Sequence, residues 1–341
     1  MKVKMAEVAR YLGISKATVS LAVNGKPGVN PQTRERIFRC IEEMEKNGGM
    51  MPEEIPRSSS KSPKLIKVVI INRRKQVVCD PEMDLWSGVL RTFDVEARKQ
   101  GYVYGVSYLN EGDDEEQRII EECNLDIVAG ILMFATEMTA EDTKILQQIH
   151  KPLVIYDYEI PNGEYSSICV DNRQAVKLAV DQLTETGVRE IRYLGTTKQI
   201  YNFEQRREAF QETLLKQDIS PKKDDIILLG SSIGEITEQA IEYLTSNPLP
   251  QAFVLENYQV SIGVLTAIRK LRIQVPEKLK LVGIDEIPEY VLSDFQLTQI
   301  SIPHEERAAM AIELLSREIE MSWKTKIRLF AIPELIHGDS V

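Results

Sequence analysis

The ten residues Ser15–Asn24 carry side chains whose types and spacing suit contacts with a nucleic acid. At 100° per residue, one side of a helix over this stretch gathers a small core stripe of Val19, Ala22 and Val23. The opposite side carries Ala17, Ser20, Leu21 and Asn24, with Lys16 on its flank. Lysine donates to base edges or phosphates, whereas alanine and leucine make only apolar contacts, best with the methyl group of thymine. A helix side that faces water is normally charged, so this side is expected to face a partner.

A single exposed leucine is common in soluble proteins, so the surroundings of this helix must decide its role. Charge is unevenly distributed along the chain. Residues 1–64 hold 12 Lys and Arg against 7 Asp and Glu, whereas the other residues hold 30 against 45. A basic segment that precedes an acidic body suggests that only the small segment meets a polyanion, although a solvated basic face would have the same charge.

Sequence motifs of catalysis are lacking. We find no G-x-G-x-x-G, no Walker loop and no G-x-S-x-G. The S-x-x-K at Ser58–Lys61 lies in a proline- and serine-rich stretch that would not hold it in place. The three histidines, His150, His304 and His337, are far apart in sequence. We therefore predict that the protein is not an enzyme.

The four cysteines have no C-x-x-C spacing and no adjacent histidine; they are Cys40, Cys79, Cys123 and Cys169. This pattern argues against a metal site or a disulfide framework and favours buried thiols, so we expect no metal and no cofactor. No apolar run is long enough for a membrane span, and the beginning MKVKMAEVARYLG lacks the apolar region of a signal peptide. We expect a cytoplasmic protein with no membrane partner.

The elements that would position these residues begin with three helices in residues 1–48. Ala6–Leu12 is the first, Ser15 caps the second, and Asn30 caps a third that begins at Pro31. Two helices joined by a tight turn at Gly13 match a helix-turn-helix. Residues 49–64 hold three prolines and four serines without an apolar period, and are predicted to be a linker.

From residue 65 onward, apolar runs rich in β-branched residues alternate with amphipathic helical stretches. The predicted strands are Lys67–Ile71, Val103–Tyr108, Ala129–Phe134, Leu153–Tyr156, Ser167–Val170, Ile191–Leu194, Ile226–Leu229, Ala252–Leu255 and Leu281–Ile284. This order predicts an α/β fold with parallel sheets covered on both faces. At this length, residues 65–341 are expected to form two Rossmann-like subdomains with a cleft between them.

Several long motifs in register identify a family. The stretch MAEVARYLGISKATVSLAVNGKPGVNPQTRERI resembles the DNA-reading headpiece of LacI/GalR transcription regulators. The stretches ICVDNRQAVKLAVDQL, RREAF and VPEKLKLVGIDEIPEYVLSDFQLTQISIP resemble the core signatures of that family in the right order. The resemblance covers nearly the whole chain and implies a helix-turn-helix headpiece, a hinge and a periplasmic-binding-protein-like core. It also implies a repressor that binds a palindromic DNA operator as a homodimer under the control of a small-molecule effector.

Residue roles in DNA binding follow from this resemblance. The base-reading positions are Lys16, Ala17 and Leu21. The phosphate-contacting positions are Thr18, Ser20, Asn24 and Arg34. Many members of the family carry arginine where Leu21 stands, so the operator of this protein is expected to differ from theirs.

The hinge departs from the family pattern. Family hinges read Y-x-P-N-x-x-A-R-x-L and insert the leucine into the minor groove. Arg57 matches the arginine, but Pro56 replaces the alanine and Ser59 the leucine, so Ile55 is the residue left to act as the wedge. A proline in so short a helix removes a hydrogen-bond donor, so we expect a weak hinge.

The effector pocket departs as well. Arg206 matches the arginine of R-x-x-G-F, and Asp285 matches the aspartate that accepts hydrogen bonds from an effector. Other positions implied to bind the effector are Asp80, Met83, Asp157, Tyr158, Asn257 and Tyr258. The expected effector is a sugar or another polar metabolite. Tyrosines where the family more often has charge predict a flatter and less acidic pocket, which disfavours a heavily hydroxylated sugar. The departures leave open a member controlled by a protein partner or without any small-molecule effector.

The resemblance also implies that the chain crosses between the subdomains near residues 160, 290 and 323. The N-subdomain would comprise about 65–160 and 291–322, and the C-subdomain about 161–290 and 323–341. Because no leucine heptad follows the strand-like Ile327–Ile332, we expect a dimer rather than a tetramer.

Overall fold

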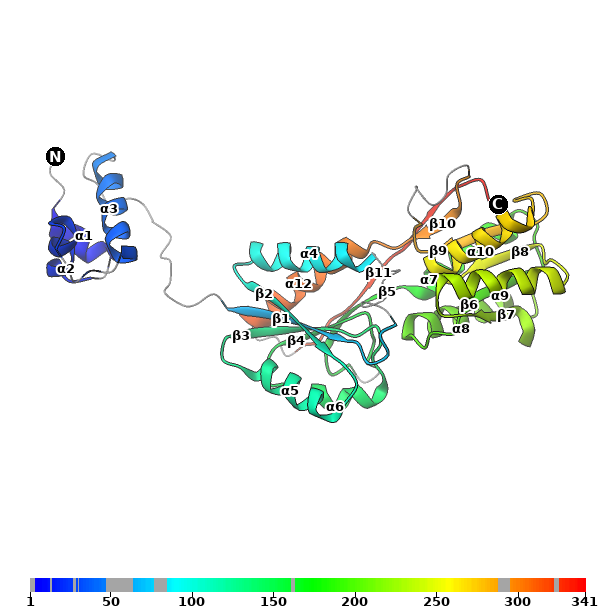
Figure 1. The fold of residues 1–341 in the computed structure, drawn as a ribbon, viewed down its shortest axis with the longest axis horizontal. Coiled ribbons are helices and arrows are strands. Elements are labelled where there is room, and N and C mark those ends of the chain that lie inside the picture. The colour runs from blue at the N-terminus through cyan, green and yellow to red at the C-terminus, as the bar shows by residue number, and fades with distance from the viewer. Residues whose placement is uncertain are drawn as a thin grey trace. The chain divides into compact units, whose positions relative to one another are not determined.

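The computed structural model describes residues 4–12, 14–26, 29, 31–46, 64–76, 85–160, 163–287, 295–321 and 325–341. The chain divides into two compact units, Met1–Lys61 and Ser62–Val341 (Figure 1). The predicted hinge residues Ile55 and Arg57 lie outside the described residues, as do Asp80 and Met83.

The first unit contains the three predicted helices, α1 (Met5–Leu12), α2 (Lys16–Val23) and α3 (Pro31–Lys46). Ser15 caps α2 as predicted, because its Oγ accepts a hydrogen bond from the backbone N–H of Thr18 at 3.1 Å. The three helices share one buried core, which consists of Val8, Ala9, Val19, Ala22, Ile37, Cys40 and Met44. Burial of Val19 and Ala22 fixes which side of α2 faces outward.

The second unit consists of two lobes, each built on a six-stranded sheet. The strands of the first lobe are β1 (Leu65–Ile71), β2 (Val103–Leu109), β3 (Val128–Phe134), β4 (Leu153–Tyr156), β5 (Ser166–Val170) and β11 (Arg328–Ala331). They are parallel and lie in the order β11-β5-β4-β3-β1-β2. Helices α4 (Leu85–Lys99) and α12 (His304–Met321) cover one face, and α5 (Asp113–Asn124) and α6 (Thr143–Leu146) cover the other (Figure 1).

The second lobe repeats this plan. Its strands are β6 (Ile191–Thr196), β7 (Ile226–Leu229), β8 (Ala252–Leu255), β9 (Lys280–Ile284), β10 (Thr298–Ser301) and β12 (Glu334–Ile336), in the order β12-β10-β9-β8-β6-β7. Only β12 is antiparallel to its neighbour among these paired strands. Helices α7 (Asn172–Glu185) and α8 (Tyr201–Lys216) pack on one face, and α9 (Ile233–Ser246) and α10 (Tyr258–Leu271) pack on the other. The predicted two-sheet α/β architecture is confirmed.

The predicted crossing points between the lobes were each about ten residues too early. Strand β5 belongs to the first sheet and β10 to the second, so the chain crosses after Val170 and again between Ser301 and His304. The third crossing lies between Ala331 and Glu334. A continuously apolar strand has the same sequence pattern in either sheet, so only its hydrogen-bonded neighbours decide the lobe to which it belongs.

Helix α12 packs closely against the first sheet at Gly130. A Cβ atom built on Gly130 of β3 would lie 2.7 Å from Ile319 Cδ1 and 2.9 Å from Leu315 Cδ1, both in α12. This close approach is possible because glycine has no side chain.

We predict that Gly130→Ala lowers the free energy of unfolding by about 1–3 kcal/mol, because overpacking forces α12 away from the sheet. The control is Gly234→Ala in α9, where an added Cβ meets nothing within 4 Å. It should leave stability unchanged or raise it by a few tenths of a kcal/mol. Urea unfolding of both variants measures the difference, and equal stabilities would contradict the assigned contact.

Candidate functional site

The outward side of α2 is the first candidate site. Lys16 and Ala17 are exposed and Leu21 is half-buried, and none of the three belongs to the core of the first unit. The predicted base-reading residues therefore share one accessible side of a helix whose other side is buried. A helix of this kind can place short side chains against base edges in a major groove.

The predicted phosphate-contacting residues also make contacts within the unit. Asn24 Nδ2 donates to the backbone O of Ser20 at 2.8 Å, and Arg34 Nη2 donates to the backbone O of Lys26 at 2.7 Å. Arg34 Nη1 lies 3.3 Å from the backbone O of Ala22. Thr18 Oγ1 lies 2.8 Å from Ser15 Oγ. The contacts of Asn24 and Arg34 satisfy carbonyl groups in and just after α2, whereas the contact of Thr18 lies at its beginning.

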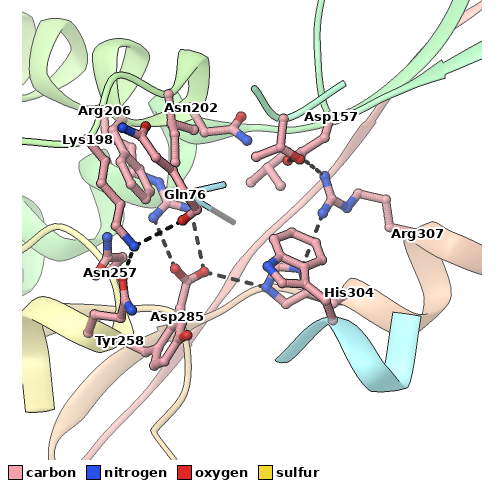
Figure 2. Close-up of a pocket in the computed structure, with 16 residues that line it drawn as sticks. Gln76, Asp157, Lys198, Asn202, Arg206, Asn257, Tyr258, Asp285, His304 and Arg307 are labelled. Atoms are coloured by element: carbon pink, nitrogen blue, oxygen red, sulfur yellow. Dashed lines mark hydrogen bonds and ion pairs between the residues drawn. The ribbon is translucent and has the colours of Figure 1, made fainter. Parts of the chain in front are cut away.

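A pocket lies where the two lobes face each other (Figure 2). Its lining comes from both lobes and comprises Gln76, Trp86, Thr136, Asp157, Val170, Lys198, Ile200, Asn202, Phe203, Arg206, Asn257, Tyr258, Gln259, Asp285, His304 and Arg307. The cavity volume is about 40 Å³, which is room for only a few water molecules. A metabolite can enter only if the lobes separate or the lining side chains move.

Two aspartates occupy corresponding places in the two lobes. Asp157 directly follows β4 and Asp285 directly follows β9, and both have left-handed backbones with φ of 74° and 68°. Few residues other than glycine adopt this conformation, and aspartate is among those that tolerate it. The turn directs both carboxylates from the carboxyl ends of parallel strands into the pocket, where ligands of such sheets bind.

Asp285 is held by Arg206 of α8. Arg206 Nη1 lies 3.2 Å from Asp285 Oδ2, and both side chains are buried. The same Nη1 donates to the backbone O of Glu256 at 2.7 Å, and Nε donates to Asn172 Oδ1 at 2.9 Å. Burial alone would raise the pKa of Asp285, but the charge of Arg206 and the contact with His304 outweigh it and hold this pKa well below its usual value.

Asp157 is held by Arg307, which is fully buried in α12. Asp157 Oδ2 also accepts a hydrogen bond from Thr136 Oγ1 at 2.7 Å, and the guanidinium of Arg307 lies 4.3 Å from the ring centroid of Tyr156. Burial would lower the pKa of Arg307, but the charge of Asp157 outweighs it and raises this pKa above its usual value.

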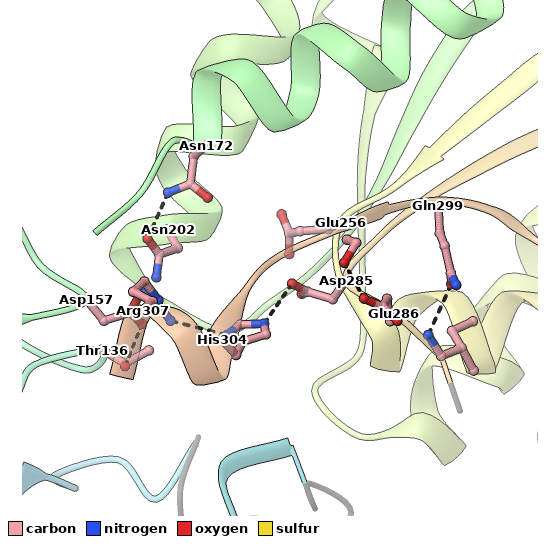
Figure 3. A network of polar contacts seen from close by, with 12 residues as sticks. Thr136, Asp157, Asn172, Asn202, Glu256, Asp285, Glu286, Gln299, His304 and Arg307 are labelled. Carbon is pink, nitrogen blue, oxygen red and sulfur yellow. Dashed lines mark hydrogen bonds and ion pairs between the residues drawn. The ribbon is translucent and has the colours of Figure 1, made fainter. Parts of the chain in front are cut away.

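His304 connects the two ion pairs and therefore the two lobes (Figure 3). Arg307 Nη2 lies 3.2 Å from His304 Nδ1, and His304 Nε2 lies 3.5 Å from Asp285 Oδ1. Arginine can only donate, so Nδ1 must be the acceptor and the proton of the neutral ring must lie on Nε2, toward Asp285. The polar chain therefore runs from Asp157 in the first lobe to Asp285 in the second.

Further contacts tie the lobes beside the pocket. Lys198 Nζ donates to the backbone O of Gln76 at 3.0 Å and to Gln259 Oε1 at 2.9 Å. Arg74 Nη1 donates to the backbone O of Gln199 at 2.8 Å. Gln76 and Arg74 belong to the first lobe, whereas Lys198 and Gln199 belong to the second, so separation of the lobes must break these hydrogen bonds.

Five of the six predicted effector residues that the structure describes line this pocket; they are Arg206, Asp285, Asn257, Tyr258 and Asp157. Tyr158 does not belong to the lining formed by the described residues, and its ring packs 4.7 Å from that of Tyr201. The role of Tyr158 in effector binding stays a prediction.

Sequence reasoning missed other lining residues, above all Lys198, His304 and Arg307. A signal was present for two of them, because His304 and Arg307 are three residues apart at the beginning of an amphipathic helix and therefore share a side. Lys198 follows a strand without any recognisable motif, and only the fold brings it to the pocket.

The described ranges contain neither a cluster of metal-binding side chains nor a membrane-spanning helix. There, no group of three or more His, Cys, Asp and Glu side chains is placed to hold a metal ion. No helix within those ranges combines the length and apolar character needed to cross a membrane.

Comparison with known proteins identifies both units. Residues 4–45 match the family model for bacterial regulatory proteins of the lacI family, and residues 180–341 match that for a periplasmic binding protein-like domain. Curated relatives with similar sequences are named as regulators rather than enzymes. Catabolite control protein A of Priestia megaterium is 24% identical over 322 residues, covering 93% of this chain and 92% of that protein. The transcriptional regulator GalS of Salmonella typhimurium is 26% identical over 318 residues, covering 92% and 88%.

The chain belongs to the LacI family. This LacI-family protein is a DNA-binding transcriptional regulator. Its fold is similar to that of the lac repressor dimer bound to operator and the anti-inducer ONPF, with a TM-score of 0.72, 18% identity and coverage of 100% of this chain and 99% of that one. It is also similar to the complex of the transcriptional regulator CelR with cellobiose, with a TM-score of 0.69, 19% identity and 99% coverage of both chains.

The ion pair Arg206–Asp285 makes a testable contribution to the stability of this LacI-family protein. Because the pKa of Asp285 is lower in the folded state, the contribution is present above about pH 4, the unfolded value, and is lost as pH falls through the folded value. We predict that Asp285→Asn lowers the free energy of unfolding at pH 7 by about 3 kcal/mol, because Arg206 loses its buried partner. The deficit should shrink as pH falls below about 4.

Urea unfolding at a series of pH values measures this difference. Asp94→Asn is the control, because Asp94 pairs with Arg98 on an exposed helix surface and should contribute less than about 1 kcal/mol. A deficit for Asp285→Asn that stays constant from pH 7 to acid would show that the ion pair is not its cause.

Proposed function

We propose that this regulator is a repressor that binds a palindromic operator as a homodimer, and that a small polar molecule in the pocket between the lobes controls its affinity for DNA. The observation that carries the DNA-binding part is the orientation of α2. Its buried side packs through Val19 and Ala22, which leaves Lys16, Ala17 and Leu21 on the accessible side.

The chemistry of this side suits the major groove. Lys16 can donate to O6 or N7 of guanine, whereas Ala17 and Leu21 make apolar contacts, best with the methyl group of thymine. Thr18, Ser20, Asn24 and Arg34 lie on or beside the same helix, where they can contact phosphates and set its register without reading sequence. Leu21 cannot make the hydrogen bonds to guanine that an arginine would make at this position, so the preferred operator sequence depends on this residue.

The homodimer follows from the symmetry of such sites. A headpiece with one base-reading helix covers one half-site, and two headpieces related by a two-fold axis match a palindrome. The similar lac repressor structure is described as a dimer bound to operator. Sedimentation of the full chain is expected to show a dimer, and the chromosomal target places its action in the cytoplasm.

Control by an effector is supported by the pocket. Similar structures hold small polar molecules, among them cellobiose and glucose. In this chain the pocket lies between two lobes joined by the contacts of His304, Lys198 and Arg74. A ligand that favours one arrangement of the lobes shifts their equilibrium by its differential affinity, and the shift is coupled to DNA binding.

The alternative is control by a protein partner, or no effector control. A metabolite panel tested for its effect on operator affinity separates these possibilities, since a protein-controlled member would respond to none of the metabolites.

We predict that Leu21→Arg changes the operator preferred in selection from random DNA and introduces guanine opposite residue 21. Each correct contact of this kind contributes about 1–3 kcal/mol of discrimination between bases. The matched control is Leu215→Arg, which adds the same charge at an exposed leucine of α8 in the other unit. The control should select the same operator as the parent protein. If Leu21→Arg and the parent protein select one motif, Leu21 does not read bases.

A further inference from the structure

We propose that the effector carries an anionic group, a carboxylate or a phosphate, and that this group binds among the N–H donors of Trp86, Arg307, Asn202 and Asn257. The inference rests on the proposal that an effector binds in this pocket and specifies its chemical class. Hydrogen-bonding groups of the lining that have no protein partner favour a ligand that can pair with them.

The acceptors of the pocket are largely used. Asp285 faces Arg206 and His304, and Asp157 accepts from Arg307 and Thr136. The amide oxygens are used as well, by the hydrogen bonds Lys198 Nζ to Gln259 Oε1, Asn172 Nδ2 to Asn202 Oδ1 and Val260 N–H to Asn257 Oδ1. The family aspartate therefore meets protein donors here instead of the hydroxyl groups of a sugar.

The orientation of the Asn202 amide follows from Arg206. Arg206 Nε can only donate, so the atom of Asn172 at 2.9 Å from it must be the oxygen. The NH₂ group of Asn172 then donates to Asn202 at 2.8 Å, so the accepting atom of Asn202 must be its Oδ1 (Figure 3). The NH₂ group of Asn202 remains for the pocket.

The orientation of the Asn257 amide follows from helix capping. Asn257 is the N-cap of α10, and its Oδ1 accepts from the backbone N–H of Val260 at 3.0 Å. A backbone N–H requires an oxygen, so Nδ2 is the atom left over. Within the described part of the chain, Nδ2 of Asn202 and Nδ2 of Asn257 have no hydrogen-bond acceptor, although these side chains are only 6% and 3% exposed.

Further donors are buried in the lining. Trp86 Nε1 and Arg307 Nε have no hydrogen-bond partner among the described residues, and these residues are 6% and 1% exposed. His304 Nε2 is a third such donor, because its 3.5 Å contact with Asp285 Oδ1 is too long for a hydrogen bond. Among the described lining residues, the buried amide oxygen without a partner is Gln76 Oε1. An unpaired buried donor costs about 1–3 kcal/mol, so a ligand that accepts hydrogen bonds stabilises this arrangement.

The helices around the pocket add to this preference. The first turns of α4, α8, α10 and α12 all contribute lining residues; these are Trp86, Asn202, Phe203, Tyr258, Gln259 and His304. The beginning of a helix carries partial positive charge and favours anions. Helix ends and spare donors therefore point to the same ligand chemistry.

A neutral polyol fits this set of groups poorly. Each of its hydroxyl groups brings a donor that needs an acceptor, and among the described lining residues Gln76 Oε1 is the buried side-chain acceptor atom with no protein partner. A carboxylate or phosphate oxygen only accepts, and charge-assisted hydrogen bonds to it are about twice as strong as neutral ones.

The indole N–H of Trp86 provides a direct test, since the chain has two tryptophans and Trp86→Phe assigns the resonance. The ¹⁵N-labelled full chain is titrated with acetate, inorganic phosphate and neutral glycerol, with sodium chloride keeping ionic strength constant. We expect acetate or phosphate to shift this resonance saturably, and glycerol to leave it unmoved. The anion with the lower midpoint identifies the group as a carboxylate or a phosphate.

Asn257→Asp is the test variant, because aspartate caps a helix as well as asparagine does but replaces the spare donor with a charged oxygen. Asn202→Asp makes the same change at the second amide. Each should raise the midpoint of the effective anion at least about tenfold. The control Gln239→Glu makes the same amide-to-carboxylate change at an exposed position of α9. It should leave the midpoint of the anion titration within about twofold of the parent value.

The inference is overturned if neither anion shifts the resonance, if glycerol saturates at a lower concentration than both anions, or if both aspartate variants leave the midpoints unchanged. Operator selection is measured separately, so the two proposals fail independently. Glycerol binding without anion binding would refute the anionic class and leave effector control in place. Anion binding by a chain that selects no operator would refute the regulatory proposal alone.

Discussion

Two buried ion pairs and the histidine between them are the feature on which the core depends. Arg206–Asp285 lies in the second lobe, Asp157–Arg307 lies in the first, and His304 contacts both pairs. A buried charge that loses its partner is strongly destabilising, so the elements that carry these side chains must keep their relative positions. The carboxyl ends of β4 and β9 and the beginnings of α8 and α12 are therefore fixed by charge as well as by apolar packing.

The same interaction shapes the pocket. Because Arg206 orients Asn172 and Asn172 orients Asn202, one guanidinium determines which face of an amide several residues away meets the cavity. Because both aspartates face arginines, each carboxylate already has a protein donor as a partner. The contacts that hold the lobes together therefore also decide which hydrogen-bonding groups of the lining have protein partners.

The chain crosses between the lobes next to this network. Helix α12 begins at His304 directly after the second crossing and then packs on the first sheet at Gly130. Any change in the angle between the lobes must move His304 relative to Asp285, and it must break the hydrogen bonds of Lys198 and Arg74 to the opposite lobe. Opening therefore costs several hydrogen bonds at once, which favours two discrete arrangements over a continuous range.

By itself, the sequence determined the elements and the family. Apolar periodicity placed the helices of the first unit and most strands of the two sheets, because it records which faces are buried. Signature motifs located Arg206, Asp285, Asn257, Tyr258 and Asp157, since motifs keep fixed distances from the ends of strands and helices. The outward side of α2 could also be read from spacing alone.

Only the tertiary structure decided which strands share a sheet. For this reason each crossing between the lobes lies about ten residues after the predicted position. The tertiary structure also brought Lys198, His304 and Arg307 into the pocket from separate parts of the chain. The physical reason is the same in each case. Strand neighbours and side-chain partners are contacts between residues far apart in sequence, and the hydrogen-bonding state of an amide or a carboxylate depends on those contacts rather than on residue type.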